Sequence, residues 1–143
     1  MTGGAVTAAG RQVCWVLVAA FALSVTHTVY AWRQGLADPG FTVTTPTTYA
    51  FYALGFGAAA LARRPARGAQ STLLAYLALV LGISVFYYPT TFTPRQQTTF
   101  AWFENDVYVG LLCVATYLTV SGLLGNRTAR TDTLPGGNGR SRR

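Results

Sequence analysis

Four apolar runs, separated by short polar segments, constrain this chain more than any other feature. They cover residues 13–32, 45–62, 72–88 and 102–124 of a chain of 143 residues. A helix needs about 20 mostly apolar residues, within a range of roughly 17–25, to cross the hydrocarbon core of a bilayer. The first, third and fourth runs qualify outright, and the second qualifies if its threonine-rich entry lies in the interface. We therefore predict an all-α fold, a polytopic bundle of four transmembrane helices joined by short loops.

Two other interpretations of these runs are open. A soluble four-helix bundle needs a polar face at the 3.6-residue helical period, yet the stretch 73–85 is almost entirely apolar. Only 10% of the chain is charged, against roughly 25% in soluble globular proteins. A cleaved signal peptide would use Arg11 and a cleavage site near residues 29–31. The first run exceeds the roughly 7–15 apolar residues of such peptides, so we expect a retained helix.

The arginines predict the orientation of the helices, because cytoplasmic segments of membrane proteins are enriched in basic residues. If the amino terminus is cytoplasmic, two arginines fall in outer loops, Arg33 and Arg95. The nine on the inner side are Arg11, Arg63, Arg64, Arg67, Arg127, Arg130, Arg140, Arg142 and Arg143. We therefore expect a multi-pass protein of the cell membrane, in our interpretation a bacterial inner membrane, with both termini in the cytoplasm.

The segment 125–143 is basic and poor in apolar residues. Such a composition cannot bury enough apolar area to fold, so a disordered cytoplasmic tail is predicted. The net charge of +7 suits anionic lipid head groups. Nucleic acid is not an expected partner, because the arginines form no stripe interleaved with aromatic residues.

Few residues suit a metal or cofactor. Cys14 and Cys113 form no Cys-x-x-Cys pair, which argues against a redox pair or zinc site. His27 is the only histidine and Met1 the only methionine, so one chain cannot supply two such axial ligands to haem. No nucleotide loop, zinc-protease helix or Ser/His/Asp arrangement is present. We predict no metal site, assign no catalytic residue and cannot name a cofactor.

In the predicted topology, aromatic residues gather at the outer ends of the helices. Tyrosine and tryptophan at a bilayer interface usually anchor the helix there, with an apolar ring and a polar tip in water. The predicted anchors are Trp32, Tyr49, Tyr52, Tyr87, Tyr88 and Trp102.

Polar and ionisable residues at the same end form a candidate binding cluster, consisting of His27, Glu104, Asn105, Asp106 and Tyr108. His27 shares a stripe with small and polar residues, and Asp106 shares one with Gly110 and Cys113, so both stripes are predicted to face the bundle. We therefore expect His27 to pair with Asp106, and Glu104 to face lipid or the loop. The alternative is that residues 104–106 lie in water at the start of the helix and only favour its dipole.

Residues 41–52 and 92–103 match at an offset of 51, with Phe-Thr and Thr-Thr-aromatic-Ala in both. A duplicated hairpin would relate the two halves by an axis along the membrane normal. The alternative is that threonine and aromatic residues are favoured at any outer interface. Small-xxx-small pairs such as Ala53 and Gly57 also favour close helix packing or docking to another subunit.

Two functions follow from these features. The first is a small, non-catalytic membrane subunit or accessory factor, which associates with other membrane subunits or with itself. The short loops and the lack of a catalytic set favour this interpretation. The second is a small membrane enzyme or carrier with an outer-facing polar cavity lined by His27, Glu104, Asp106 and tyrosines. A stable hetero-complex in mild detergent would favour the first, and uptake of a small ligand the second.

Overall fold

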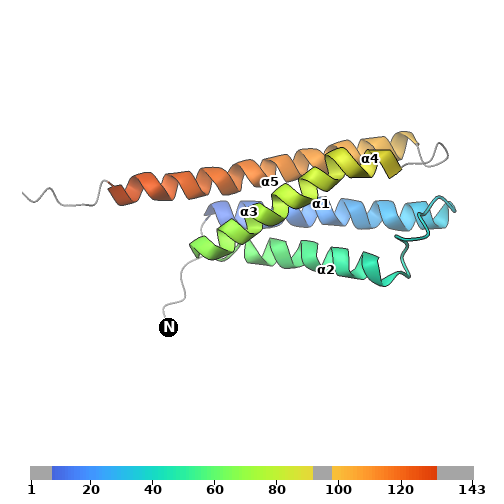
Figure 1. Cartoon of the computed structure of the whole chain (residues 1–143), viewed down its shortest axis with the longest axis horizontal. Helices are drawn as coiled ribbons and strands as arrows, with labels where there is room; N and C mark the ends of the chain where they lie inside the picture. Colours follow the sequence, from blue (N-terminus) through green and yellow to red (C-terminus); the bar gives the residue numbers. More distant parts are fainter. Residues whose placement is uncertain (1–7, 92–97, 132–143) are drawn as a thin grey trace, which may run out of the picture.

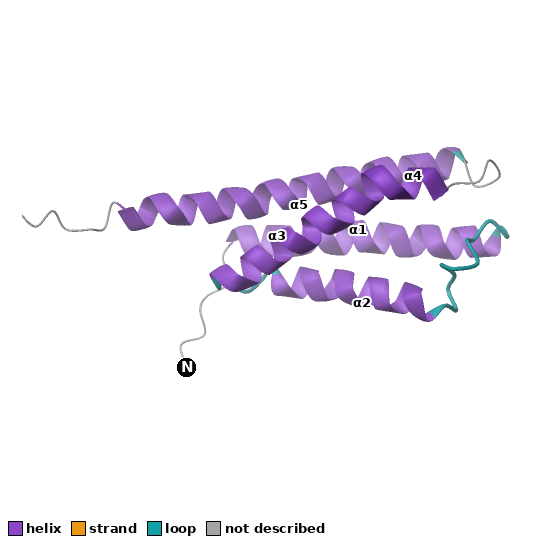
Figure 2. Cartoon of the chain, viewed as in Figure 1, coloured by secondary structure: helices purple, strands orange, loops and turns teal. Residues whose placement is uncertain are grey.

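The computed structural model describes residues 8–91 and 98–131, without the side chains of residues 91 and 126–131. Every regular element in these ranges is helical (Figure 2). The helices are α1 (Ala8–Arg33), α2 (Pro46–Leu61), α3 (Arg67–Gly82), the π-helix η1 (Ile83–Tyr87), α4 (Tyr88–Thr91) and α5 (Thr99–Thr131). The predicted all-α class is therefore confirmed.

Successive helices run in opposite directions along one long axis, and α3, η1 and α4 form one continuous rod (Figure 1). The most extensive contacts join α1 to α5, followed by those of α1 with α2 and of α3 with α5. The centre of the bundle is built from Leu17 and Phe21 of α1, Leu77 of α3 and Leu112 of α5, all fully buried. The antiparallel pair α1 and α5 therefore forms the spine on which α2 and α3 pack.

Within the described residues, three helical stretches are long and apolar enough to cross a membrane: Ala8–Arg33, Arg67–Thr90 and Thr99–Gly125. Only 28%, 22% and 22% of their most apolar windows are buried inside the structure. Most of this apolar surface therefore faces outward, as in a multi-pass membrane protein embedded in lipid. The helix α2 has 16 residues and is shorter than each of these three stretches.

A close approach of α1 and α2 depends on Gly55. A Cβ atom added at this position would lie 2.5 Å from the ring of Phe21. That ring is held in place by Phe51 and Tyr108, at centroid distances of 5.6 and 5.8 Å. Glycine lets the backbones approach closely here, as small residues do at membrane helix interfaces.

The first helix ends in a glycine cap that directs the next segment. The amide of Gly35, with φ of 65°, donates to the carbonyl of Trp32, and the amide of Leu36 donates to that of Ala31. This pair of bonds is the Schellman motif, in which a left-handed residue is required and glycine is favoured. The cap turns the chain back over the end of the bundle, so that residues 36–38 reach the helices there.

The third helix changes from α to π geometry at Ile83–Tyr87. The amide of Tyr88 donates to the carbonyl of Ile83, five residues earlier. Pro89 follows immediately; it lacks the amide that would continue the α pattern, and its ring clashes with the carbonyl four residues before it. The sequence-based prediction of a plain helix over 72–88 missed this widened turn.

The fifth helix extends past the predicted end at residue 124 to Thr131. Residues 125–131 were predicted to be disordered, and the structure makes them helical. The remainder of the predicted tail, 132–143, lies outside the described residues.

The helices of the two segments that match at an offset of 51 residues do not bury equivalent positions. Thr48 and Gly55 of α2 are buried, whereas Thr99 and Asp106, their counterparts in α5, are exposed. The two helices therefore present different positions of the repeat to the core, which disagrees with a simple duplication of the hairpin.

Candidate functional site

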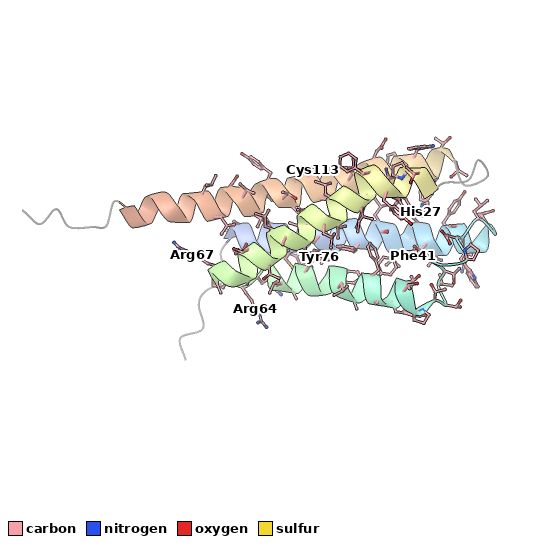
Figure 3. The ribbon with its side chains drawn as sticks, viewed as in Figure 1. His27, Phe41, Arg64, Arg67, Tyr76 and Cys113 are labelled. Carbon is pink, nitrogen blue, oxygen red and sulfur yellow. The ribbon has the colours of Figure 1, made fainter. Side chains whose placement is uncertain are left out.

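The outer end of the predicted topology holds a cavity of about 330 Å³. Small-molecule sites usually range from about 300 to 1,000 Å³. The cavity is enclosed by α1, the segment 36–41, α2, the α3–η1–α4 rod and the start of α5. His27 and Phe41 lie at this end of the bundle, far from Arg64 and Arg67 at the other (Figure 3).

The polar floor of the cavity is formed by α1 and α5. Nδ1 of His27 lies 3.7 Å from Oε2 of Glu104, which is an ion-pair distance if the imidazole is protonated but too long for a direct hydrogen bond. Glu104 is only 4% exposed and Asn105 only 7%. A carboxylate and an imidazole are thus held close together inside a helical bundle.

The partner predicted for His27 was wrong. Asp106 is exposed, together with Gly110, Cys113 and Tyr117 on the same side of α5. The face of α5 that packs inward carries Glu104, Tyr108, Leu112 and Ala115 instead. Large apolar side chains fill the space between α5 and its neighbours, and they outweigh the preference for small and polar residues used in the prediction.

Two polar atoms at this end are buried without a hydrogen-bond partner in the described part of the chain, Nδ1 of His27 and the hydroxyl of Tyr108. Buried polar groups are normally paired, so such exceptions require an explanation. Both residues line the cavity. A ligand or an ordered water in the cavity would satisfy them.

The aromatic residues at this end divide into two groups. Trp32, Tyr49, Tyr87 and Trp102 are exposed, as expected of interfacial anchors, although their anchoring role stays a prediction. Tyr52 lies inward, and its hydroxyl bonds to the hydroxyls of Thr28 at 2.6 Å and Ser24 at 3.4 Å. Tyr88 is half-buried and lines the cavity.

One aromatic contact fixes the orientation of the histidine. The ring of His27 stacks on Phe100 at a centroid distance of 5.8 Å and an angle of 11°. The ring of Tyr30 packs edge-to-face against the same Phe100 ring, at a centroid distance of 4.8 Å. Phe100 was not among the predicted site residues; its position in the aromatic segment before Glu104 was the available signal.

The polar groups of the cavity can hold and exchange protons with a ligand, but they do not form a metal centre. Among residues 8–91 and 98–131, no group of three or more His, Cys, Asp and Glu side chains could hold a metal ion. Asp38 and Glu104 are the acidic residues of the described lining, His27 is its only base, and it includes no arginine.

Comparisons of the chain with protein-family models, with curated proteins and with solved structures gave no match.

Proposed function

We propose that this chain is a four-span protein of the cell membrane, with both termini in the cytoplasm. The fourth span is α2, whose 16 residues extend about 24 Å at 1.5 Å per residue. A bilayer adapts to a short span by local thinning. The segment before α2 is held by threonine hydroxyls, including the bond of Thr45 to Thr48 at 2.8 Å, which suits an interface.

The orientation is supported by the arginines. Arg63 and Arg64 follow α2, and Arg67 begins α3, all at the end of the bundle where α1 begins (Figure 3). Arg33 is at the opposite end, in the last turn of α1. Because basic residues are retained on the cytoplasmic side, the end with the three arginines is assigned to the cytoplasm and the cavity to the outer side.

Cysteine accessibility tests both the count and the orientation. In a background without Cys14 and Cys113, Thr44→Cys should react with an impermeant maleimide added outside intact cells. Gly68→Cys should react only after permeabilisation. Labelling of both from the same side would remove α2 as a span, and the reverse pattern would refute the orientation.

We further propose that the protein binds a small ligand in this cavity, as a carrier, receptor or small enzyme. The observation that carries the proposal is the cavity of about 330 Å³, in whose lining His27 and Glu104 lie 3.7 Å apart. Mostly apolar walls with a few convergent polar groups are characteristic of ligand sites. The unpaired hydroxyl of Tyr108 adds a group that can orient a ligand.

Access to the cavity can be tested without knowing the ligand. Ser84 is buried and lines the cavity, whereas its neighbour Val85 lies at the same depth and is exposed on the outside of the bundle. A thiol reacts with methyl methanethiosulfonate as its thiolate, which requires water. Ser84→Cys should therefore react faster than the matched control Val85→Cys. Equal reactivity would show that water and small solutes do not reach the cavity, and would refute ligand binding there.

A second candidate function is that of a subunit in a larger membrane complex. It is favoured by the exposed carboxylate of Asp106 on the outward face of α5, beside Gly110. An acid facing lipid is costly, and a neighbouring helix with a basic or hydrogen-bonding side chain would remove that cost. A complex with a different chain that survives mild detergent and is lost in Asp106→Asn would support this role. A monomer of unchanged mass would argue against it.

A further inference from the structure

The cavity has an unbalanced set of charges. Two carboxylates line it, Asp38 on the segment after α1 and Glu104 on α5. His27 can supply at most one positive charge, and no arginine is among the described lining residues. When both acids are ionised, the described lining therefore carries a net charge of −2, or of −1 if His27 is protonated. An anionic ligand would meet repulsion from these two acids and would find no permanent cation among the described lining residues.

The cavity walls are rich in aromatic rings. Phe41, Phe51, Tyr87 and Tyr88 line it from the loop, α2 and the α3–η1–α4 rod, and Tyr30 lines it from α1. The negative faces of aromatic rings attract cations, and cages of such rings bind quaternary ammonium groups. The rings also supply apolar surface for the uncharged body of a ligand.

The buried acid has unused capacity to bind. Among the described residues, the ion-pair partner of Glu104 is His27, whose Nδ1 lies 3.7 Å from Oε2, beyond hydrogen-bond distance. A buried carboxylate is costly unless it is paired or neutralised. A cation that enters the cavity would pair with the carboxylate of Glu104, in a lining that also holds His27 and the aromatic rings.

We propose that the cavity binds a compact organic cation, a quaternary or protonated amine attached to a small apolar body. This inference rests on the proposed ligand-binding function and specifies the class of ligand. Glu104 pairs with the positive group, the aromatic rings surround it, and Asp38 attracts it at the segment that covers the cavity. A metal ion is a poor occupant, because the described residues offer no suitable group of ligands.

Two probes of the same shape and opposite charge test the class of ligand. Benzyltrimethylammonium and phenylmethanesulfonate each join a benzyl group to a tetrahedral head of three substituents. The affinity of each for the full-length protein in an uncharged detergent is measured by calorimetric titration. The cation should bind at least about tenfold more tightly, as expected for one charge interaction in a partly screened site. Equal affinity, tighter binding of the anion, or no binding of the cation would overturn the proposal.

Three substitutions locate the charge that is responsible. Glu104→Gln keeps the size of the side chain and should weaken cation binding by about tenfold. Asp106→Asn is the matched control, because this acid lies two residues away on the exposed face, and should leave the affinity unchanged. Should Glu104→Gln not fold, Asp38→Asn on the exposed segment should weaken binding by roughly two- to threefold. Unchanged affinity in a folded Glu104→Gln or Asp38→Asn variant would refute the assignment.

The two proposals fail in different ways. The reactivity of Ser84→Cys reports whether the cavity is open, and methyl methanethiosulfonate is uncharged. If that cysteine reacts but the cation is not preferred, the class of ligand is wrong and the binding cavity remains. If that cysteine behaves like Val85→Cys, the cavity itself is refuted.

Discussion

Gly55→Ala should destabilise the bundle, although alanine is the better helix former. The added methyl group would lie 2.5 Å from the ring of Phe21. That ring is fully buried and cannot move aside easily, because it packs against Phe51, Phe56 and Tyr108 at centroid distances of 5.6, 6.1 and 5.8 Å. The methyl group can be accommodated only if α1 and α2 separate.

The expected size follows from two opposing effects. Extra volume in a well-packed core typically costs about 1–3 kcal/mol. Replacing glycine by alanine inside a helix recovers about 0.5–1 kcal/mol. Because Phe21 is enclosed by three rings, the upper part of the packing cost applies, and we expect a net loss of about 1–2 kcal/mol. Gly57→Ala has open space around its Cβ position and should gain up to about 1 kcal/mol.

The free energy of unfolding of both variants is measured by SDS titration in mixed micelles, with helix content followed by circular dichroism. Gly57→Ala is the control for helix propensity, since it lies on the same helix and contacts no other element within 4 Å of the added atom. Gly55→Ala should be the less stable of the two by about 1.5–3 kcal/mol. Equal stability would refute the close approach of α1 and α2.

Three further experiments test the geometry of the site. Tyr52→Phe removes the hydrogen bond to Thr28 of 2.6 Å and should cost about 1 kcal/mol in the same SDS titration; no loss would show that the bond is not made. His27→Ala, Glu104→Gln and the double variant should depart from additivity by more than about 0.5 kcal/mol, because neighbouring residues couple; additive losses would separate the two side chains. Pro89→Ala restores a backbone amide and should favour a regular α turn in place of η1. In this background Ser84→Cys should react with methyl methanethiosulfonate at a different rate. An unchanged rate would show that Pro89 does not affect the shape of the cavity.

The first, third and fourth apolar runs are long enough to be distinctive, and each lies within a long apolar helical stretch of the structure. The ends of the helices were less predictable. Arg67 begins α3 before the apolar run, and Thr131 ends α5 beyond it, since hydropathy marks the apolar part of a helix and not its polar ends. The π turn before Pro89 depends on the backbone hydrogen bonds around a proline that lacks an amide, and hydropathy carries no information on backbone hydrogen bonds.

The site was predicted only in part. His27, Glu104, Asn105 and Tyr108 do line one cavity, as their shared end of the bundle suggested. The rotation of α5 about its axis was not predicted correctly, and Asp106 therefore faces outward. In a helix that is apolar on all sides, periodicity does not indicate which face meets lipid. That choice depends on how Tyr108 and its neighbours fit against the other helices.

The fully buried layer in the middle of the bundle has a consequence for permeation. Leu17 and Phe21 of α1 lie between Val13, in a second cavity at the other end, and Ser24 in the cavity described above. Both side chains are fully buried, so a solute in the outer cavity meets packed side chains between that cavity and the second one. In the proposed orientation it therefore enters and leaves by the same side. Crossing the whole membrane field is worth about 2.3 kcal/mol per charge at 100 mV. A cation held near one surface crosses only part of that field, so its occupancy should respond weakly to voltage.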